Sequence, residues 1–576
     1  MNGTLRRLGT AAAVLVVGLG ALASPASAQA ADSDAYTATL LAKAKPDECF
    51  NGIGVPYPVG PPCAEGQSKV NQAYVWGLTK IGSDVWFGTG ANVNCLVSGA
   101  TLDSYTPVVN KDYVCEYAES GTVRDNASWP ADIGDQRPPE VWLYNACTKK
   151  SVNKSGEIRA KSADDAKRLS ETIGLRAAGN LNGVVFFGGP ALNDSLNLFA
   201  FDAHTNKFIG SINLPQYGNI RTFLVAEKAL YLGVGIGNNG SSGGGVLRWT
   251  GSLKNPFSFE VVGSLPVQAA DLTYYDGRIA ITSWPASKPT STTQLAGVWT
   301  SPKLADGEPG LNPEDAAGWT QSWNAGQYEP DRIMSATYGG GGIAAYDGYL
   351  YWGTMHVPMK ATKVYQNAYP QTTDEGKKAQ VANTQRAISI WRGKDLGTPN
   401  AKIELLYGAT ALPTYSPSTA TWSTVSTGWT PLYGASGFDH PFNNYTWRMV
   451  VADGKLFVGT MDWSYIVQDI ANQGAASSLD AGDAKAMTDP ANLGASAIDP
   501  SAYGGDLWMF PSTTEKAVPI STTGLGNYLN YGIRNMVVDG DGLYIGMANP
   551  MNLRTDTSGD VPQGGWELIK LDKSPK

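Results

Sequence analysis

Hydrophobic residues in this chain recur as short apolar runs that end in small residues, not at helical spacing. A tight-turn pair precedes nearly every run: Gly82-Ser83, Asn182-Gly183, Asp276-Gly277, Asp347-Gly348, Asp453-Gly454 and Asp541-Gly542. Asn-Gly and Asp-Gly supply the positive φ angles that short hairpin loops require. Because another apolar stretch precedes each turn, each copy predicts a β-hairpin. The seven runs are 84–90 (DVWFGTG), 183–189 (GVVFFGG), 229–235 (ALYLGVG), 278–284 (RIAITSW), 349–355 (YLYWGTM), 455–461 (KLFVGTM) and 542–548 (GLYIGMA).

A third apolar segment follows each hairpin and often contains tryptophan, as in Val298-Trp299, Ile390-Trp391 and Leu507-Trp508. Seven units of three or four antiparallel strands predict an all-β fold, a seven-bladed β-propeller of four-stranded blades. On these repeated hairpins the chain resembles β-propellers in general across roughly residues 70–571. It lacks the Asp-box of sialidases and the Gly-His and Trp-Asp signature of WD40 repeats.

The last unit lacks a fourth strand, because only five residues follow its third strand at 566–571. A strand edge left open in this way is a site for aggregation. We therefore expect the N-terminal segment 35–42 (AYTATLLA) to pair in the last blade and close the ring.

The N-terminus has the form of an export signal. Arg6-Arg7 precedes an apolar core at 8–23, and Ala26-Ser27-Ala28 is a small-residue cleavage site. The apolar core is too short for a membrane anchor. We expect residues 1–28 to be removed and 29–576 to form a single, monomeric propeller outside the cytoplasm. Removal leaves 41 basic and 51 acidic residues, a net charge of −10, which argues against a nucleic-acid partner.

All five cysteines lie in the first 150 residues. In an exported chain they favour two disulfides and one thiol. The pairs with the shortest loops are Cys49–Cys63 and Cys95–Cys115, which leaves Cys147, expected in a core strand of the first blade. No CxxC or His-spaced cluster indicates a metal, and no motif assigns a cofactor.

The long insertions all fall between strands on one side of the repeat. Residues 90–139, 356–387 and 462–503 expand loops between second and third strands, and 302–340 and 408–445 enlarge connections between units. Such loops on a rigid scaffold commonly carry binding or catalysis, although they also occur as tolerated decoration or as covers for strand edges. The pattern predicts long loops gathered on one face.

Aligning the seven units places an unusual set of residues at the start of the innermost strands. These residues would lie at one level around the mouth of the central channel of the propeller, where buried charges need acids or a ligand to offset the free-energy cost of burial. The planar guanidinium group of arginine suits carboxylate, sulfate or phosphate. The alternative is that these arginines tie neighbouring blades together, and a one-residue slip would turn any of them away. The residues are Trp76, Arg176, Arg221, Asp271, Gly342, Arg448 and Arg534.

Candidate proton-transfer groups lie near the same face. His356 directly follows the second strand of the fifth unit, and His440 and Tyr445 lie where the first strand of the sixth unit begins. Histidine suits proton transfer near neutral pH, yet at a loop edge it is often only a hydrogen-bonding residue. Asp462, after the second strand of the sixth unit, is a further ligand-binding candidate.

The sequence therefore predicts a secreted propeller that binds a polar, anionic ligand, such as an extracellular glycan, on its loop-rich face. Degradation of that glycan by a lyase or hydrolase would use His356, His440 and Tyr445, by analogy with seven-bladed polysaccharide lyases. The alternative is an extracellular propeller that binds a glycan, an ion or a protein without catalysis. The residues assigned to binding are Arg176, Arg221, Asp271, Arg448, Arg534 and Asp462.

Overall fold

A computed structural model describes residues 36–57, 60–101, 105–126, 128–286, 292–305, 310–472, 498–555 and 563–574. The expected signal peptide at 1–28 and part of the 462–503 insertion lie outside these residues. The described chain is predominantly β, and successive strands pair antiparallel in groups of four. The expected hairpin turns are present, since Asn182-Gly183, Asp276-Gly277, Asp347-Gly348 and Asp453-Gly454 all adopt positive φ angles.

The first three four-stranded groups follow the order of the chain. They consist of β4 (Gln72–Ile81), β5 (Asp84–Ala91), β8 (Val141–Asn145) and β9 (Lys150–Asn153); β10 (Ala177–Leu181), β11 (Val184–Ala191), β12 (Ser195–Asp202) and β13 (Lys207–Leu214); and β14 (Asn219–Ala226), β15 (Ala229–Gly235), β16 (Gly244–Trp249) and β17 (Phe259–Leu265).

The next groups repeat the pattern. They consist of β18 (Gln268–Tyr275), β19 (Arg278–Trp284), β20 (Gly297–Thr300) and β21 (Thr320–Asn324); β22 (Tyr338–Tyr346), β23 (Tyr349–His356), β24 (Ile390–Lys394) and β25 (Lys402–Tyr407); and β28 (Asn443–Ala452), β29 (Lys455–Asp462), β30 (Leu507–Phe510) and β31 (Val518–Ser521).

The final group joins the two ends of the described chain. β32 (Gly532–Asp539), β33 (Gly542–Ala548) and β34 (Glu567–Lys573) pair in order, and β1 (Tyr36–Lys43) pairs antiparallel with β34. The pairing expected of the N-terminal segment is therefore present. The first strands of successive groups also contact one another in sequence, and β32 contacts β4.

Apolar side chains fill the spaces between neighbouring sheets. Between the second and third groups, Phe186 of β11 stacks on Phe223 of β14, with ring centroids 6.1 Å apart. Burial on both faces explains why these strands are nearly continuous apolar runs in the sequence. The architecture is all-β and propeller-like.

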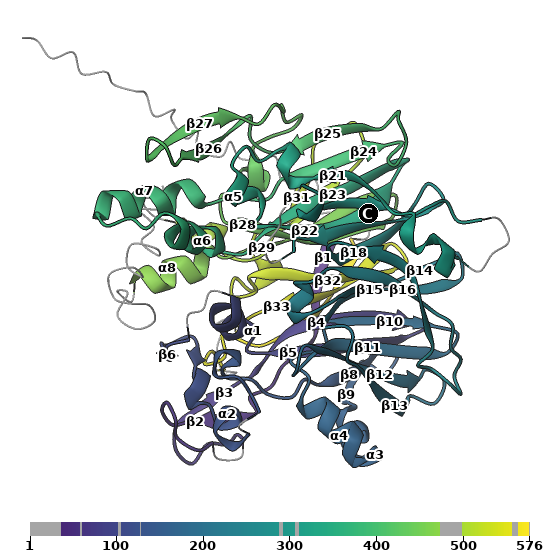
Figure 1. Cartoon of the computed structure of the whole chain (residues 1–576). Coiled ribbons are helices and arrows are strands. Elements are labelled where there is room, and N and C mark those ends of the chain that lie inside the picture. Colours follow the sequence, from purple (N-terminus) through teal and green to yellow (C-terminus); the bar gives the residue numbers. More distant parts are fainter. Residues whose placement is uncertain are drawn as a thin grey trace, which may run out of the picture.

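Short helices and small hairpins lie outside these sheets. Figure 1 shows α1, α6, α7 and α8 gathered on one side of the strands, at the left of the view, with α3 and α4 at its lower edge. The elements are α1 (Val93–Leu96), α2 (Gly121–Asp125), α3 (Ser155–Lys161), α4 (Ala163–Ser170), α5 (Arg332–Ser335), α6 (Lys360–Ala368), α7 (Asp374–Thr384), α8 (Ser464–Asn472), and the pairs β2 (Glu48–Phe50) with β3 (Gln67–Lys69), β6 (Val108–Val109) with β7 (Val114–Cys115), and β26 (Ala411–Ser416) with β27 (Thr421–Ser426).

Two expectations from the sequence need correction. The segment 302–340 is not only a connection, because it contains β21, the fourth strand of its sheet. The hydrophobic spacing of the sequence also predicts no helices, whereas the described residues include the short helices α1 to α8. Side-chain caps mark the starts of α2, α4, α5 and α7, where Ser120, Ser162, Asp331 and Thr373 accept hydrogen bonds from backbone N–H groups.

The cysteines pair as expected. Cys49 bonds to Cys63, and Cys95 bonds to Cys115. Cys147 is free, but it is exposed and follows the end of β8, so it does not lie in a core strand. Among the described residues, no helix combines the length and apolar character needed to span a membrane.

Candidate functional site

A large cavity, here called the central pocket, lies where the innermost strands meet the insertions. Its volume is about 1610 Å³. Every one of the five insertions contributes to its lining, for example through Val93, Arg332, Lys360, Tyr415 and Trp463. In the part of the chain that the structure describes, the long loops therefore gather around one site.

Six of the seven aligned ring residues line the central pocket, and Gly340 and Gly341 take the place of the seventh, Gly342. We call the four arginines among them the arginine ring. Five of the six lie in the innermost strands of five different groups, Arg176 directly precedes the innermost strand of a sixth, and the structure brings all six to one cavity. They are Trp76, Arg176, Arg221, Asp271, Arg448 and Arg534.

The alignment nevertheless slips by one residue in β28. Trp76, Arg221 and Arg534 are the extra residues at irregularities in strand pairing, whereas the corresponding extra residue in β28 is Trp447. Arg448 comes one position later and is paired. A β-bulge re-aims the side chains around it, and both Trp447 and Arg448 reach the central pocket.

Arg448 is the arginine of the ring that has an acid partner. Its Nη1 donates to Asp271, whose other carboxylate oxygen accepts from the backbone N–H of Ile343 at 3.3 Å. The expected pairing of Asp271 with one arginine is therefore observed. Asp271 is engaged by this pair and by the backbone.

The other three arginines lack an ion-pair partner among the described residues. Arg176 donates to the Asn219 side chain at 3.2 Å, and its Nε is buried without a hydrogen bond. Arg221 and Arg534 make no hydrogen bond or ion pair with the described chain, and the Nε of Arg221 is also buried. Unpaired buried donors of this kind carry a free-energy cost that a bound anion would relieve.

Burial acts strongly on these three guanidinium groups. Desolvation lowers the pKa of Arg176 to about 10 and that of Arg534 to about 9, and Arg176 and Arg448 act on Arg534 in the same direction. The pKa of Arg221 is lowered by burial and by the charges of Arg176 and Arg534. All three keep their charge at neutral pH, so the pocket concentrates positive charge in a protein of net charge −8.

Tryptophan rings support the cations. Such cation–π contacts hold a charge in place without neutralising it, so the cations remain able to bind a ligand. The distances from cation to ring centroid are 5.4 Å for Arg176 over Trp76, 3.9 Å for Arg221 over Trp284, 5.9 Å for Lys360 over Trp284 and 5.8 Å for Arg534 over Trp447.

The charge of the whole lining is positive. Seven basic side chains face four acidic ones, and two of those acids are already engaged: Asp271 by Arg448, and Asp331 by the backbone N–H groups of Ile333 and Met334 in α5. The basic residues are Arg176, Arg221, Arg332, Lys360, Lys363, Arg448 and Arg534, and the acidic ones are Asp132, Asp194, Asp271 and Asp331.

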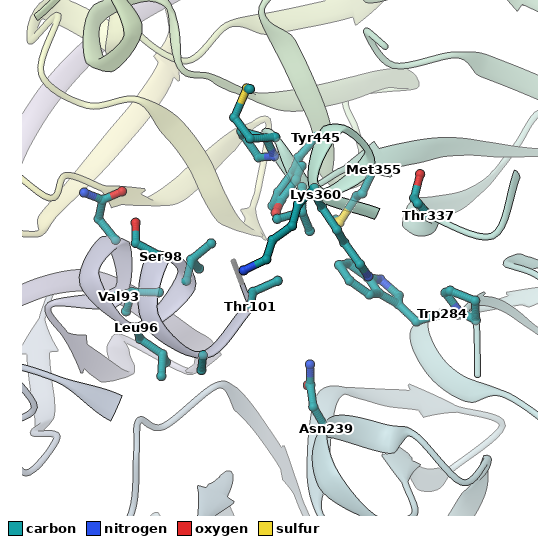
Figure 2. Close-up of a pocket in the computed structure, with 18 of the residues that line it drawn as sticks. Val93, Leu96, Ser98, Thr101, Asn239, Trp284, Thr337, Met355, Lys360 and Tyr445 are labelled. Atoms are coloured by element: carbon teal, nitrogen blue, oxygen red, sulfur yellow. The ribbon is translucent and has the colours of Figure 1, made fainter. Parts of the chain in front are cut away.

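The walls of the pocket are largely apolar. Figure 2 shows Val93 and Leu96 on one side and Trp284 and Met355 on the other, with Lys360 extending between them. Further aromatic rings come from the innermost strands. The site therefore joins a cationic group of strand residues to aromatic and aliphatic walls, which suits an anion with an apolar or ring-shaped body. These rings include Tyr74 of β4, Trp447 of β28 and Tyr531, which directly precedes β32.

Tyr445 is the one catalytic candidate that lines the central pocket. Its ring meets Trp447 edge to face at 5.5 Å. Burial raises the pKa of its hydroxyl, although Arg221, Arg176 and Arg534 act in the opposite direction. The hydroxyl therefore stays protonated at neutral pH and can donate a hydrogen bond to a ligand beside the arginines.

His356 is buried outside the central pocket. Its Nε2 lies 3.0 Å from the Thr354 hydroxyl, and its ring meets Tyr338 edge to face at 4.3 Å. Burial, reinforced by Arg386, lowers the pKa of His356 to about 3, so it is neutral. Side chains alternate along a strand, and its neighbour Met355 faces the pocket instead.

His440 and Asp462 lie close to each other but outside the lining. His440 Nε2 lies 3.3 Å from the carbonyl of Ala502 and 3.9 Å from Oδ1 of Asp462. Asp462 accepts from the Ser464 backbone at 2.9 Å and from the Gly504 backbone at 3.1 Å. These contacts organise the segments before β28 and after β29, so the two residues do not join the arginine ring.

Two residues of the site have no signal in the sequence. Lys360, the first residue of α6, enters the pocket from the insertion after β23, and Trp447 enters through the bulge in β28. Nothing in the local pattern marks either residue, because a helix start and a bulge position both depend on tertiary packing. In the described part of the chain, no three His, Cys, Asp or Glu side chains are placed to hold a metal ion.

Comparison with known proteins identifies no family. No protein-family model and no curated protein matches the chain. Among solved structures, "Pyrococcus horikoshii acylaminoacyl peptidase (uncomplexed)" aligns with a TM-score of 0.31 and 7% identity, over 83% of this chain and 58% of the peptidase. The beta-propeller domain of the Trilobed protease from Pyrococcus furiosus aligns with a TM-score of 0.23 and 9% identity, over 62% and 96%. Similarity at this level assigns neither a family nor an activity.

Proposed function

We propose that this chain is a secreted, closed seven-bladed β-propeller that binds an anionic ligand in the central pocket. The observation that carries the proposal is the arginine ring: Arg176, Arg221 and Arg534 line the pocket with no ion-pair partner among the described residues. Guanidinium groups without an ion-pair partner bind carboxylate, sulfate or phosphate oxygens well.

The size of the pocket supports a ligand larger than a single sugar. Ligand pockets commonly have volumes of about 300–1,000 Å³, and this one exceeds that range. Aromatic rings such as Trp76, Trp284 and Trp447 offer flat surfaces on which sugar rings stack. An oligosaccharide that carries carboxylates is the ligand class that fits both features.

Binding is better supported than catalysis. A lyase or hydrolase reaction in this pocket would depend on Tyr445, since His356 and His440 lie outside the lining. Tyr445 is protonated at neutral pH, which suits a hydrogen-bond donor better than a base. The catalytic alternative is checked by assaying glycans for new reducing ends and for the absorbance of unsaturated uronates.

Titration calorimetry on the purified protein tests the proposal. We expect an oligogalacturonate to bind and a neutral malto-oligosaccharide of equal length not to bind, with affinity falling as salt concentration rises. Arg221→Met should weaken oligogalacturonate binding by about tenfold or more, the loss expected for one charge-assisted hydrogen bond. Arg159→Met, at an exposed position on α3, is the matched control and should bind normally. Equal binding by the two variants would contradict the proposal.

A further inference from the structure

Lys360 is a further cation of the central pocket, and anion binding by the arginine ring does not explain its presence there. It is the first residue of α6 and lines the pocket, and Figure 2 shows its side chain extending into the open centre. The amine makes no hydrogen bond or ion pair with the residues that the structure describes. It lies over the ring of Trp284, whose centroid is 5.9 Å from Nζ.

The surroundings of Lys360 disfavour its charged form. Burial lowers the pKa of Lys360, and the charge of Arg221 lowers it further. The position at the start of α6 acts in the same direction, since the positive end of the helix dipole disfavours a cation there. A lysine that is desolvated beside another cation is an activated nucleophile toward carbonyl carbon.

An anion-binding group lies beside this amine. Arg221 packs against the same Trp284 ring, with its guanidinium carbon 3.9 Å from the ring centroid. Because both cations contact one indole ring, a carboxylate held by Arg221 would bring the rest of its molecule toward Lys360. One small ligand can therefore engage both groups.

We propose that Lys360 forms a reversible imine with a ligand that carries both a carbonyl group and a carboxylate. The inference rests on the proposed function, because the arginine ring supplies the anion-binding half of the site. The substrate class is an oxo acid, and the open-chain form of a uronic acid belongs to it, with an aldehyde and a carboxylate in one molecule.

The chemistry balances without a further reactant. The lone pair of Lys360 Nζ attacks the carbonyl carbon, the C=O π electrons move to oxygen, and a proton passes from nitrogen to that oxygen. The resulting carbinolamine takes up a second proton on oxygen, breaks its C–O bond and releases water, leaving a protonated C=N bond. Hydrolysis reverses each step.

Reductive trapping tests this inference on the full-length protein. Glyoxylate and 4-carboxybenzaldehyde, a short and a long probe that each carry an aldehyde and a carboxylate, are incubated with the protein and sodium cyanoborohydride. Peptide mass spectrometry should find one carboxymethyl or carboxybenzyl group at Lys360. Methyl 4-formylbenzoate, the neutral ester of the long probe, should label Lys360 about tenfold more slowly, because it forgoes one charge-assisted hydrogen bond.

Three variants separate the amine from its charge. Lys360→Met and Lys360→Arg should lose the label, while Lys378→Met, at an exposed position on α7 outside the lining, should keep it. Lys360→Arg retains the positive charge, so loss of its label reports loss of the amine. Melting temperatures of all variants, compared with that of the wild type, show whether a lost label reflects loss of folding instead. Labelling spread evenly over other lysines, or equal labelling by the neutral ester, would overturn the inference.

The outcome also distinguishes the two proposals. If oligogalacturonate binds and neither acid probe is trapped at Lys360, imine formation is wrong and the anion-binding function stands. If the acid probes and the neutral ester label Lys360 equally and oligogalacturonate does not bind, both the carboxylate specificity of Lys360 and the anion-binding function are wrong.

Discussion

Among single residues, Arg448 and Arg534 occupy the innermost strands of neighbouring groups but differ in what surrounds them. Arg448 is paired with Asp271, whereas Arg534 has no ion-pair partner among the described residues. The two arginines therefore contribute differently to stability and to binding, although the alignment of the repeats treats them as equivalent.

Replacing each arginine with methionine should separate these roles. Arg448→Met leaves the Asp271 carboxylate buried without its partner and should lower the free energy of unfolding by about 1–3 kcal/mol. Arg534→Met removes an uncompensated cation and should leave stability within about 0.5 kcal/mol of the wild type, while weakening oligogalacturonate binding. Urea denaturation and calorimetry provide the two measurements. A larger loss of stability in Arg534→Met than in Arg448→Met would show that the unpaired arginines tie the blades together.

His356 should make stability depend on pH. Its pKa is lowered from 6.5 to about 3 in the folded protein, so below pH 6.5 the unfolded chain binds a proton that the folded chain does not. The stabilisation is fully present above pH 6.5 and is lost as the pH falls toward 3. His356→Gln should therefore lose less stability than the wild type between about pH 7.5 and pH 4.5.

Urea denaturation at these two pH values measures the effect. His204→Gln is the matched control because His204 is exposed, and its profile should follow the wild type. Parallel profiles for His356→Gln and wild type would indicate that His356 can take up a proton without unfolding.

Among the elements, the insertions build the pocket and a disulfide anchors one of them. Cys95–Cys115 joins the start of the 90–139 insertion to β7, and Cys115 itself lines the central pocket. Cys49–Cys63 closes a loop of similar length, but neither of its cysteines lines the pocket. The two bridges thus form a natural comparison.

Removing either bridge by paired Cys→Ser substitution should cost about 3 kcal/mol of stability, as loop-closure entropy predicts for loops of this length. Only the loss of Cys95–Cys115 should also weaken oligogalacturonate binding, because the wall that carries Val93 and Leu96 then gains freedom. Melting temperature and calorimetry on both double variants check this. Equal effects on binding would mean that the wall does not depend on its bridge.

For the molecule as a whole, β1 determines whether the last sheet has an open edge. Tyr36 to Lys43 pair with Lys573 to Glu567, and Tyr36 packs on Phe457 of β29 with ring centroids 5.5 Å apart. The N-terminal strand therefore contributes to two neighbouring groups of strands at once.

A chain that begins after β1 should be less stable and should aggregate, because β34 would then expose unpaired N–H and C=O groups. A synthetic peptide of residues 36–43 added in excess should restore solubility by pairing with β34. Light scattering and thermal denaturation measure both effects. A truncated protein that melts like the full chain and stays monomeric would contradict the proposed closure.

Local backbone preferences are enough to specify the strands and their turns. Apolar runs ending in small residues, with Asn-Gly and Asp-Gly before them, allow hairpins such as those at Asn182-Gly183 and Asp453-Gly454 to be predicted directly. The repeat then places Arg176, Arg221 and Arg534 at equivalent positions, because equivalent strands begin at the same level. That much of the pocket follows from the order of residues.

Which side chains face the pocket depends instead on packing between distant segments. A bulge in β28 brings Trp447 into the position that Arg534 holds in β32, and the alternation of side chains sends Met355 into the pocket and His356 away from it. The insertion after β23 delivers Lys360 at the start of a helix. These outcomes rest on one-residue differences in register and on loop packing over long sequence separations, which the local pattern of the chain does not encode.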